Sequence, residues 1–156
     1  MTFGSVDAAL DAARRAIVLN PHNAEAVWQL GFREWLAGKY QTGTEIVQRA
    51  IDESPSYPPW FHWGLAAENY RIGNYRTALH HAEVMGTPDL VFVEGLRAMI
   101  YGQLGRTQEA QRSLANCRRL DPAFDSRALD WFATHRMQSD ILDLFLDGLS
   151  KAGLER

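Results

Sequence analysis

Histidine is the residue type in this chain most suited to binding a metal ion, because neutral imidazole is a common metal ligand and five histidines are present. His80 and His81 are adjacent, so on a helix their side chains diverge by about 100° and cannot chelate one ion. The i, i+4 spacing that would allow chelation does not occur. His62 lies between Phe61 and Trp63 and is interpreted as a polar groove residue or a solvated one. We therefore predict no metal site and no cofactor.

Candidate nucleophiles and acid–base pairs are equally sparse. Cys117 is the single cysteine, which excludes an intrachain disulfide and fits a reducing compartment. Asp140, Asp143 and Asp147 are helical neighbours whose spacing indicates a solvated helix face, whereas general acid–base work would need them in a cleft. No glycine-rich phosphate loop follows a strand, and no serine, threonine or cysteine stands in a recognisable nucleophile setting. We predict that the chain is not an enzyme.

Aromatic residues give the strongest indication of a binding surface, because four of the five tryptophans fall between residues 28 and 63. Spacings of three, four and seven residues put the members of each set on one helical face. The sets are Trp28, Phe32 and Trp35, then Trp60, Trp63 and Tyr70, then Phe92 and Met99. Exposed apolar patches beyond a few hundred Å² usually mark an interaction site, so we predict that these residues bind a partner.

The elements that position these rings are predicted from an internal repeat. Pro21 and Pro55 each close an apolar, alanine-rich segment and lie 34 residues apart. Gly38, Gly73 and Gly105 fall between helical patterns at intervals of 35 and 32 residues, which indicates turns because glycine readily takes the left-handed conformation past a helix end. No segment has the pattern of a strand. We expect helices near 5–19, 24–37, 41–53, 59–71, 75–85, 89–104, 107–119, 123–135 and 139–152.

Capping chemistry supports these breaks. Asn23, Thr87 and Ser139 are suitable N-caps, because their side chains can accept a hydrogen bond from the first turn of a helix. Pro59 and Pro88 suit the first helical position, where a missing amide hydrogen costs nothing.

Charge and hydropathy exclude two classes of partner. The 156 residues include 16 Lys and Arg against 19 Asp and Glu, and this net charge of −3 is too acidic for a protein that mainly grips a nucleic-acid backbone. The most apolar segment, residues 90–101, is interrupted by Glu94 and Arg97, which would be costly in lipid. The N-terminus lacks the pattern of a signal peptide. We predict a cytoplasmic protein that binds neither nucleic acid nor membrane.

The repeat resembles that of tetratricopeptide repeat (TPR) proteins. In residues 24–57 the resemblance is carried by Leu30-Gly31, Tyr40, Val47, Ala50 and Pro55. Two further units carry related patterns, namely Leu65-Ala66, Gly73-Asn74-Tyr75, Ala78 and Ala82, then Ala98, Tyr101, Gly105, Ala110, Leu114, Cys117 and Asp121-Pro122. The resemblance implies an all-α, right-handed TPR solenoid of antiparallel helix pairs with a C-terminal capping helix.

On this pattern, residues 1–156 form a single TPR domain. It comprises a half repeat (1–23), three units (24–57, 58–88 and 89–122) and a capping helix pair (123–156). Cys117 occupies a position where the family has a small buried residue, whereas Glu34 and Glu94 replace large apolar or aromatic residues. The half repeat leaves one apolar flank open, so we expect either a longer chain or self-association through that flank.

The resemblance also implies a function for the aromatic residues, because the first helices of TPR units line a concave groove. The positions of the polar clamp found in chaperone-binding members hold Trp28, Phe32, Trp63 and Ala67, which favours an apolar or aromatic-rich segment over a carboxylate-terminated tail. Alternatively, several rings are buried between helices or under the C-terminal helix. If the groove is open, Trp63→Ala is expected to weaken partner binding and leave helicity intact.

Two functions are therefore predicted. The first is a non-catalytic protein–protein interaction module that binds a peptide or protein segment in this groove. The second follows from residues 146–154, which resemble the tails of TPR regions behind class III nucleotidyl cyclase or winged-helix DNA-binding domains of bacterial regulators. That resemblance implies a regulatory or oligomerisation domain of a bacterial adenylate cyclase or transcription regulator.

Overall fold

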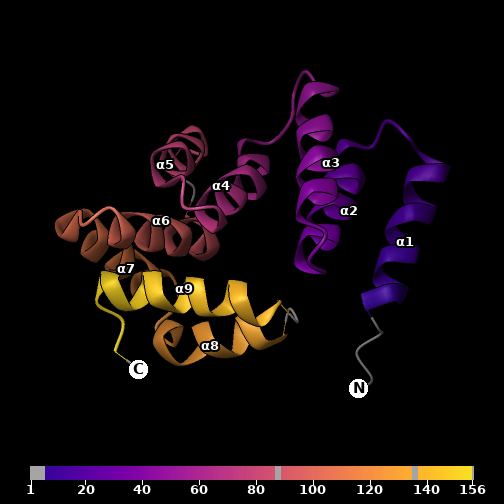
Figure 1. The fold of residues 1–156 in the computed structure, drawn as a ribbon. Coiled ribbons are helices and arrows are strands. Elements are labelled where there is room, and N and C mark those ends of the chain that lie inside the picture. Colours follow the sequence, from indigo (N-terminus) through magenta and orange to yellow (C-terminus); the bar gives the residue numbers. More distant parts are fainter. Residues whose placement is uncertain (1–5, 87–88, 135–136, 156) are drawn as a thin grey trace.

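The computed structural model describes residues 6–86, 89–134 and 137–155, and within these ranges short turns join α-helices (Figure 1). No strand occurs in the described part of the chain, so the prediction of an all-α fold is confirmed. A 3₁₀ turn, η1 (Pro59–Phe61), leads directly into the fourth α-helix. The α-helices are α1 (Val6–Leu19), α2 (Ala24–Leu36), α3 (Tyr40–Asp52), α4 (His62–Arg71), α5 (Tyr75–Val84), α6 (Val91–Gln103), α7 (Thr107–Leu120), α8 (Phe124–Thr134) and α9 (Ser139–Ala152).

The helices α2 and α3, α4 and α5, and α6 and α7 form pairs, and the turn inside each pair contains a predicted glycine. Gly38, Gly73 and Gly105 have φ of +90°, +80° and +69°, a region that glycine adopts without steric cost. In the first turn the Lys39 amide donates to the Glu34 carbonyl oxygen at 3.0 Å, which satisfies a carbonyl at the helix end. The glycine turns predicted from the spacing are thus confirmed.

The first pair shows why small residues recur in the repeat. A Cβ on Gly31 would lie 2.8 Å from the Gly43 carbonyl oxygen, and a Cβ on Gly43 would lie 2.6 Å from the Gly31 carbonyl oxygen. The backbones of α2 and α3 therefore touch where the helices cross, and larger side chains would hold them apart. Gly31, one of the residues that carry the family resemblance, therefore lies at this crossing.

The predicted helix starts agree in part with the structure. Asn23 caps α2, and its side-chain oxygen accepts a hydrogen bond from the backbone amide three residues on, at 3.1 Å. Pro59 is the first residue of η1, as expected. Ser139 is the first residue of α9 and Gln138 occupies the N-cap, so that prediction is one residue out. Two predicted starts lie outside the described residues: Thr87 and Pro88.

A buried carboxylate holds α1 against α2. Glu34 is 4% exposed, and Arg14 of α1 donates to its Oε1 at 2.9 Å while Lys39 lies 3.0 Å from its Oε2. Burial alone would raise the pKa of Glu34, but hydrogen bonds and charge from Lys39 and Arg14 outweigh it and hold the pKa below its ordinary value. At the end of α1, Val18 and Leu19 are exposed, and self-association through this flank stays a prediction.

The C-terminal helix does more than close the end of the stack. Figure 1 shows α9 lying along α6, its main contact, and a Cβ on Gly102 of α6 would lie 2.6 Å from the Gly148 carbonyl oxygen of α9. The other end of α9 reaches the turn between α2 and α3, where the Tyr40 hydroxyl lies 3.4 Å from both carboxylate oxygens of Asp140. The helix therefore crosses the face that the first helices of the units form.

Candidate functional site

Five of the eight predicted groove residues are buried, namely Trp28, Trp35, Trp63, Tyr70 and Met99. Trp35, Tyr70 and Met99 are 3%, 1% and 2% exposed. The indole nitrogen of Trp35 donates to a Glu68 carboxylate oxygen at 2.8 Å, and the Tyr70 hydroxyl donates to the Leu144 carbonyl oxygen of α9 at 2.7 Å. Trp35 and Tyr70 are core residues that line neither of the two cavities described below, which differs from the expectation, whereas Met99 lines the smaller cavity.

The helix α9 is the reason that the far part of the expected groove is closed. Its Phe145 packs edge-on against Tyr70 and Trp63, with ring centroids 5.6 and 6.5 Å apart. Gln103 of α6 donates to Asp147 of α9 at 2.9 Å, and Asp147 is half-buried. This differs from the expectation that Asp147 lies on a solvated helix face. The chain itself thus occupies the face beside α4 and α6 that a ligand would otherwise use.

Five of the predicted residues meet in one hollow of about 430 Å³, which we call the aromatic hollow. Trp28 and Trp63 are mostly buried, Phe32 and Trp60 are half-buried, and Phe92 is 37% exposed. The hollow is formed by α2, η1, α4 and the start of α6, so three consecutive units contribute to it. Its lining residues are Glu25, Trp28, Gln29, Phe32, Trp60, Trp63, Leu90 and Phe92.

Two indole hydrogen bonds fix the walls of the aromatic hollow. Trp28 Nε1 donates to the Phe61 carbonyl oxygen at 2.9 Å, and Trp63 Nε1 donates to the Phe92 carbonyl oxygen at 3.0 Å. Each bond joins the first helix of one unit to the start of the next unit, so the same contact recurs one repeat further along. Because the protein satisfies both indole N–H groups, these rings need no polar group from a ligand.

Two ring pairs around the aromatic hollow meet at steep angles, whereas Trp28 and Phe32 stack with ring centroids 5.0 Å apart and an interplanar angle of 20°. The ring centroids of Trp28 and Trp60 are 4.8 Å apart with an interplanar angle of 81°, and those of Phe32 and Trp63 are 5.2 Å apart at 86°. Edge-to-face packing is a favourable arrangement for aromatic pairs and restricts ring motion. The walls are therefore held by ring contacts within the protein.

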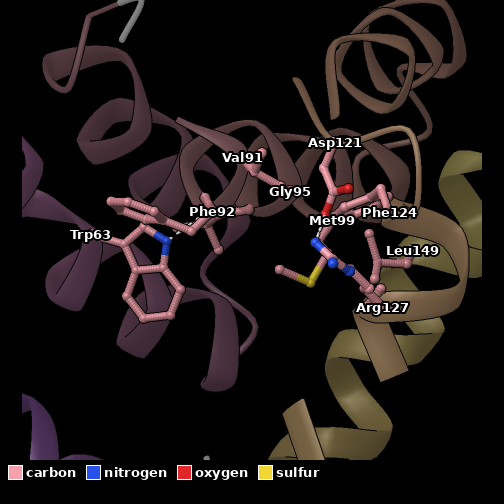
Figure 2. A pocket seen from close by; sticks show the side chains of 11 residues that line it. Trp63, Val91, Phe92, Gly95, Met99, Asp121, Phe124, Arg127 and Leu149 are labelled. Carbon is pink, nitrogen blue, oxygen red and sulfur yellow. Dashed lines mark hydrogen bonds and ion pairs between the residues drawn. The ribbon is translucent and has the colours of Figure 1, made fainter. Parts of the chain in front are cut away.

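A second apolar cavity, of about 260 Å³, shares Trp63 and Phe92 with the aromatic hollow, and we call it the distal cavity. In Figure 2, Trp63 and Phe92 stand at one end of it and Asp121 and Arg127 at the other. Asp121 and Arg127 form an ion pair at 3.4 Å, and the Arg127 side chain is 69% exposed. The lining residues are Trp63, Val91, Phe92, Gly95, Leu96, Met99, Asp121, Phe124, Arg127, Ala128 and Leu149.

A histidine pair was not predicted from the sequence. His62 Nδ1 of α4 and His81 Nδ1 of α5 lie 2.9 Å apart, and the Tyr57 hydroxyl lies 3.0 Å from His62 Nε2. One ring must donate and the other accept, so this arrangement needs at least one neutral imidazole. Burial, reinforced by His62 and His80, lowers the pKa of His81 to about 4, and burial also lowers the pKa of His62. The two histidines are 19 residues apart on different helices, so helical spacing gives no indication of the pair.

The histidine pair predicts a loss of stability in mild acid. The pKa of His81 is about 4 in the folded state and about 6.5 in the unfolded state. The contribution of His81 to the free energy of unfolding is therefore fully present above pH 6.5 and is lost as the pH falls toward 4. We expect a loss on the order of 1–2 kcal/mol, after allowing for the partial exposure of both rings. Between pH 4 and 7, the free energy of unfolding measured with urea should depend less steeply on pH in His81→Gln than in the parent protein. The assignment to His81 would be contradicted if His81→Gln left this pH dependence unchanged. It would also be contradicted if His22→Gln, at an exposed position, reduced the pH dependence equally.

Cys117 offers no reactive thiol at neutral pH. The residue is fully buried, and burial, together with the charge of Glu94, raises the pKa of its thiol to about 12. Its expected role as a small buried residue is confirmed. Within the ranges that the structure describes, no three His, Cys, Asp or Glu side chains gather into a group that could hold a metal ion. Among those same residues, no helix combines the length and apolar character required to cross a bilayer.

No family model matches the sequence, and no curated protein matches it. Solved structures do match. TTC0263, a thermophilic TPR protein of Thermus thermophilus, has a TM-score of 0.67 at 22% identity and covers 94% of this chain and 83% of its own. MamA 41-end from Desulfovibrio magneticus RS-1 has a TM-score of 0.62 at 16% identity, over 97% of this chain and 89% of that one. YrrB has a TM-score of 0.58 at 15% identity, over 94% of this chain and 77% of that one. The chain therefore has the fold of an all-α TPR solenoid.

Proposed function

We propose that this helical-repeat protein is a non-catalytic interaction module that binds an apolar segment of a partner polypeptide at the aromatic hollow. The observation that carries the proposal is the convergence of Trp28, Phe32, Trp60, Trp63 and Phe92, from three consecutive units, on one open space of about 430 Å³. Aromatic side chains with few rotatable bonds contribute much buried area at a low entropic cost.

The distal cavity supports a second anchor point. Phe92 is shared by both spaces and is 37% exposed, so it stands between them and is accessible to a ligand. A partner segment would place one side chain in the aromatic hollow and a second, apolar side chain in the distal cavity. Because the lining of both spaces is fixed by helix packing and indole hydrogen bonds, binding would order the partner more than the protein.

Two further observations support a polypeptide ligand. The helix α9 already lies on the neighbouring face, and its Leu149 lines the distal cavity, so this side of the stack accommodates apolar helical side chains. Among the solved neighbours, YrrB is described as a TPR protein with an unusual peptide-binding site.

Trp60→Ala is predicted to weaken peptide binding at least about tenfold, because truncation of a partly exposed aromatic anchor removes both contact area and a wall of the hollow. Ligands are first selected from a random peptide phage-display library against the full chain. Their affinities for the parent and the variant are then measured by fluorescence anisotropy.

Ile72→Ala is the matched control, because Ile72 is 57% exposed and does not line the aromatic hollow. It should leave the affinity unchanged, and both variants should keep a cooperative unfolding transition. Selected peptides that bind Trp60→Ala as tightly as the parent protein would rule out the hollow as the binding site.

A further inference from the structure

The polar groups of the aromatic hollow are free to meet a ligand. Glu25 is the one charged residue among those that line it, and it is exposed. No residue in the described ranges forms a hydrogen bond or ion pair with the Glu25 carboxylate or with the side-chain amide of Gln29. Other carboxylates near the helix pairs, such as Glu34 and Glu68, are engaged by basic side chains. The hollow therefore presents one negative charge and one side-chain amide, and no basic residue lines it.

Aromatic faces add to this preference for positive charge. The face of an indole or phenyl ring carries partial negative charge and attracts an ammonium or guanidinium group within about 6 Å. Around the aromatic hollow, Trp28 and Phe32 stack on each other, while Trp60 is steeply inclined to Trp28 and Trp63 is steeply inclined to Phe32, so the ring faces have more than one orientation. Such an enclosure suits a cation better than a flat stack does.

We propose that the aromatic hollow binds a cationic side chain, lysine or arginine, that belongs to an otherwise apolar segment of the partner polypeptide. The alkyl stem of that side chain packs against Trp60 and Phe92, and its charged end lies near Glu25. This inference rests on the proposed function and specifies the chemistry of its ligand. The same carboxylate disfavours an acidic or phosphorylated segment in the hollow.

Two capped peptides test the inference: acetyl-Gly-Leu-Lys-Leu-Gly-amide and the same peptide with norleucine in place of lysine. Binding to the ¹⁵N-labelled full chain is followed by the indole N–H resonances, with Trp60→Phe used to identify one of them. We expect the lysine peptide to bind about three- to tenfold more tightly than the norleucine peptide. Glu25→Gln should remove most of that advantage, and added salt should reduce it.

The control is Glu45→Gln, which neutralises an exposed carboxylate on α3 outside the aromatic hollow. It should leave the preference for lysine unchanged. Equal affinities of the two peptides, or a lysine preference that Glu25→Gln leaves unchanged, would overturn the cation inference and leave the proposed function standing if the hollow resonances still shift. If neither peptide shifts these resonances, the inference fails, and the display-selected peptides then decide the proposed function separately.

Discussion

Gly102→Ala is expected to destabilise the protein by about 1–3 kcal/mol, because the added Cβ would lie 2.6 Å from the Gly148 carbonyl oxygen and 3.0 Å from the Ala152 nitrogen. Both contacts are with backbone of α9, so no side-chain rotation can relieve them. The helix α9 must move away from α6, and contacts of Phe145 and Leu149 with the core weaken with it. Urea unfolding measures the loss, and faster hydrogen exchange of α9 amides would locate it.

Gly95→Ala is the matched control, because it makes the same chemical change in the same helix. A Cβ on Gly95 would meet only Phe124 atoms, at 3.8 and 3.9 Å, which is ordinary van der Waals contact. Alanine is favoured over glycine inside a helix by about 0.5–1 kcal/mol, so this variant should be as stable as the parent or more stable. If Gly102→Ala is no less stable than Gly95→Ala, α9 is not seated against α6 as described.

The repeat could be predicted from the sequence because its determinants are local. A glycine turn, an N-cap such as Asn23 and a small residue at a crossing such as Gly31 each act within one helix pair, and each recurs with the period of the repeat. The position of α9 depends instead on contacts with helices far away in the chain, including Tyr40 and Tyr70. A pattern along α9 identifies its apolar face, but it does not show which helices that face covers.

The candidate site could also be predicted from the sequence only in part. Helical spacing placed Trp28, Phe32, Trp60, Trp63 and Phe92 on first helices, and these five do line the aromatic hollow. Spacing could not separate them from Trp35 and Tyr70, which line neither cavity, or from Met99, which lines only the distal cavity, because the position of α9 and of the next unit decides which side chains stay accessible. Glu25 could not be predicted as a site residue, because an acidic residue in the first turn of a helix is equally explained by its favourable interaction with the helix dipole.

Trp63→Ala is expected to cost about 3–5 kcal/mol of unfolding free energy, the range for truncating a large buried aromatic residue. Trp63 is 3% exposed, and its ring contacts Phe32, Phe92 and Phe145. Its indole nitrogen also donates to the Phe92 carbonyl oxygen, which would lose this partner. This prediction differs from the expectation from the sequence, which is that the variant weakens binding and keeps its helicity. Chemical denaturation followed by far-ultraviolet circular dichroism measures the loss.

Phe92→Ala separates the effect of an aromatic side chain of the hollow on peptide binding from its effect on stability. Phe92 is 37% exposed and keeps its carbonyl oxygen as the acceptor for Trp63 after truncation, so its loss of stability should be under about half that of Trp63→Ala. Its effect on peptide affinity should nevertheless match that of Trp60→Ala, because both side chains are accessible walls of the aromatic hollow. Equal destabilisation by Trp63→Ala and Phe92→Ala would contradict the burial of Trp63. Binding at the hollow is therefore best tested through Trp60 and Phe92, since loss of binding in Trp63→Ala would also follow from unfolding.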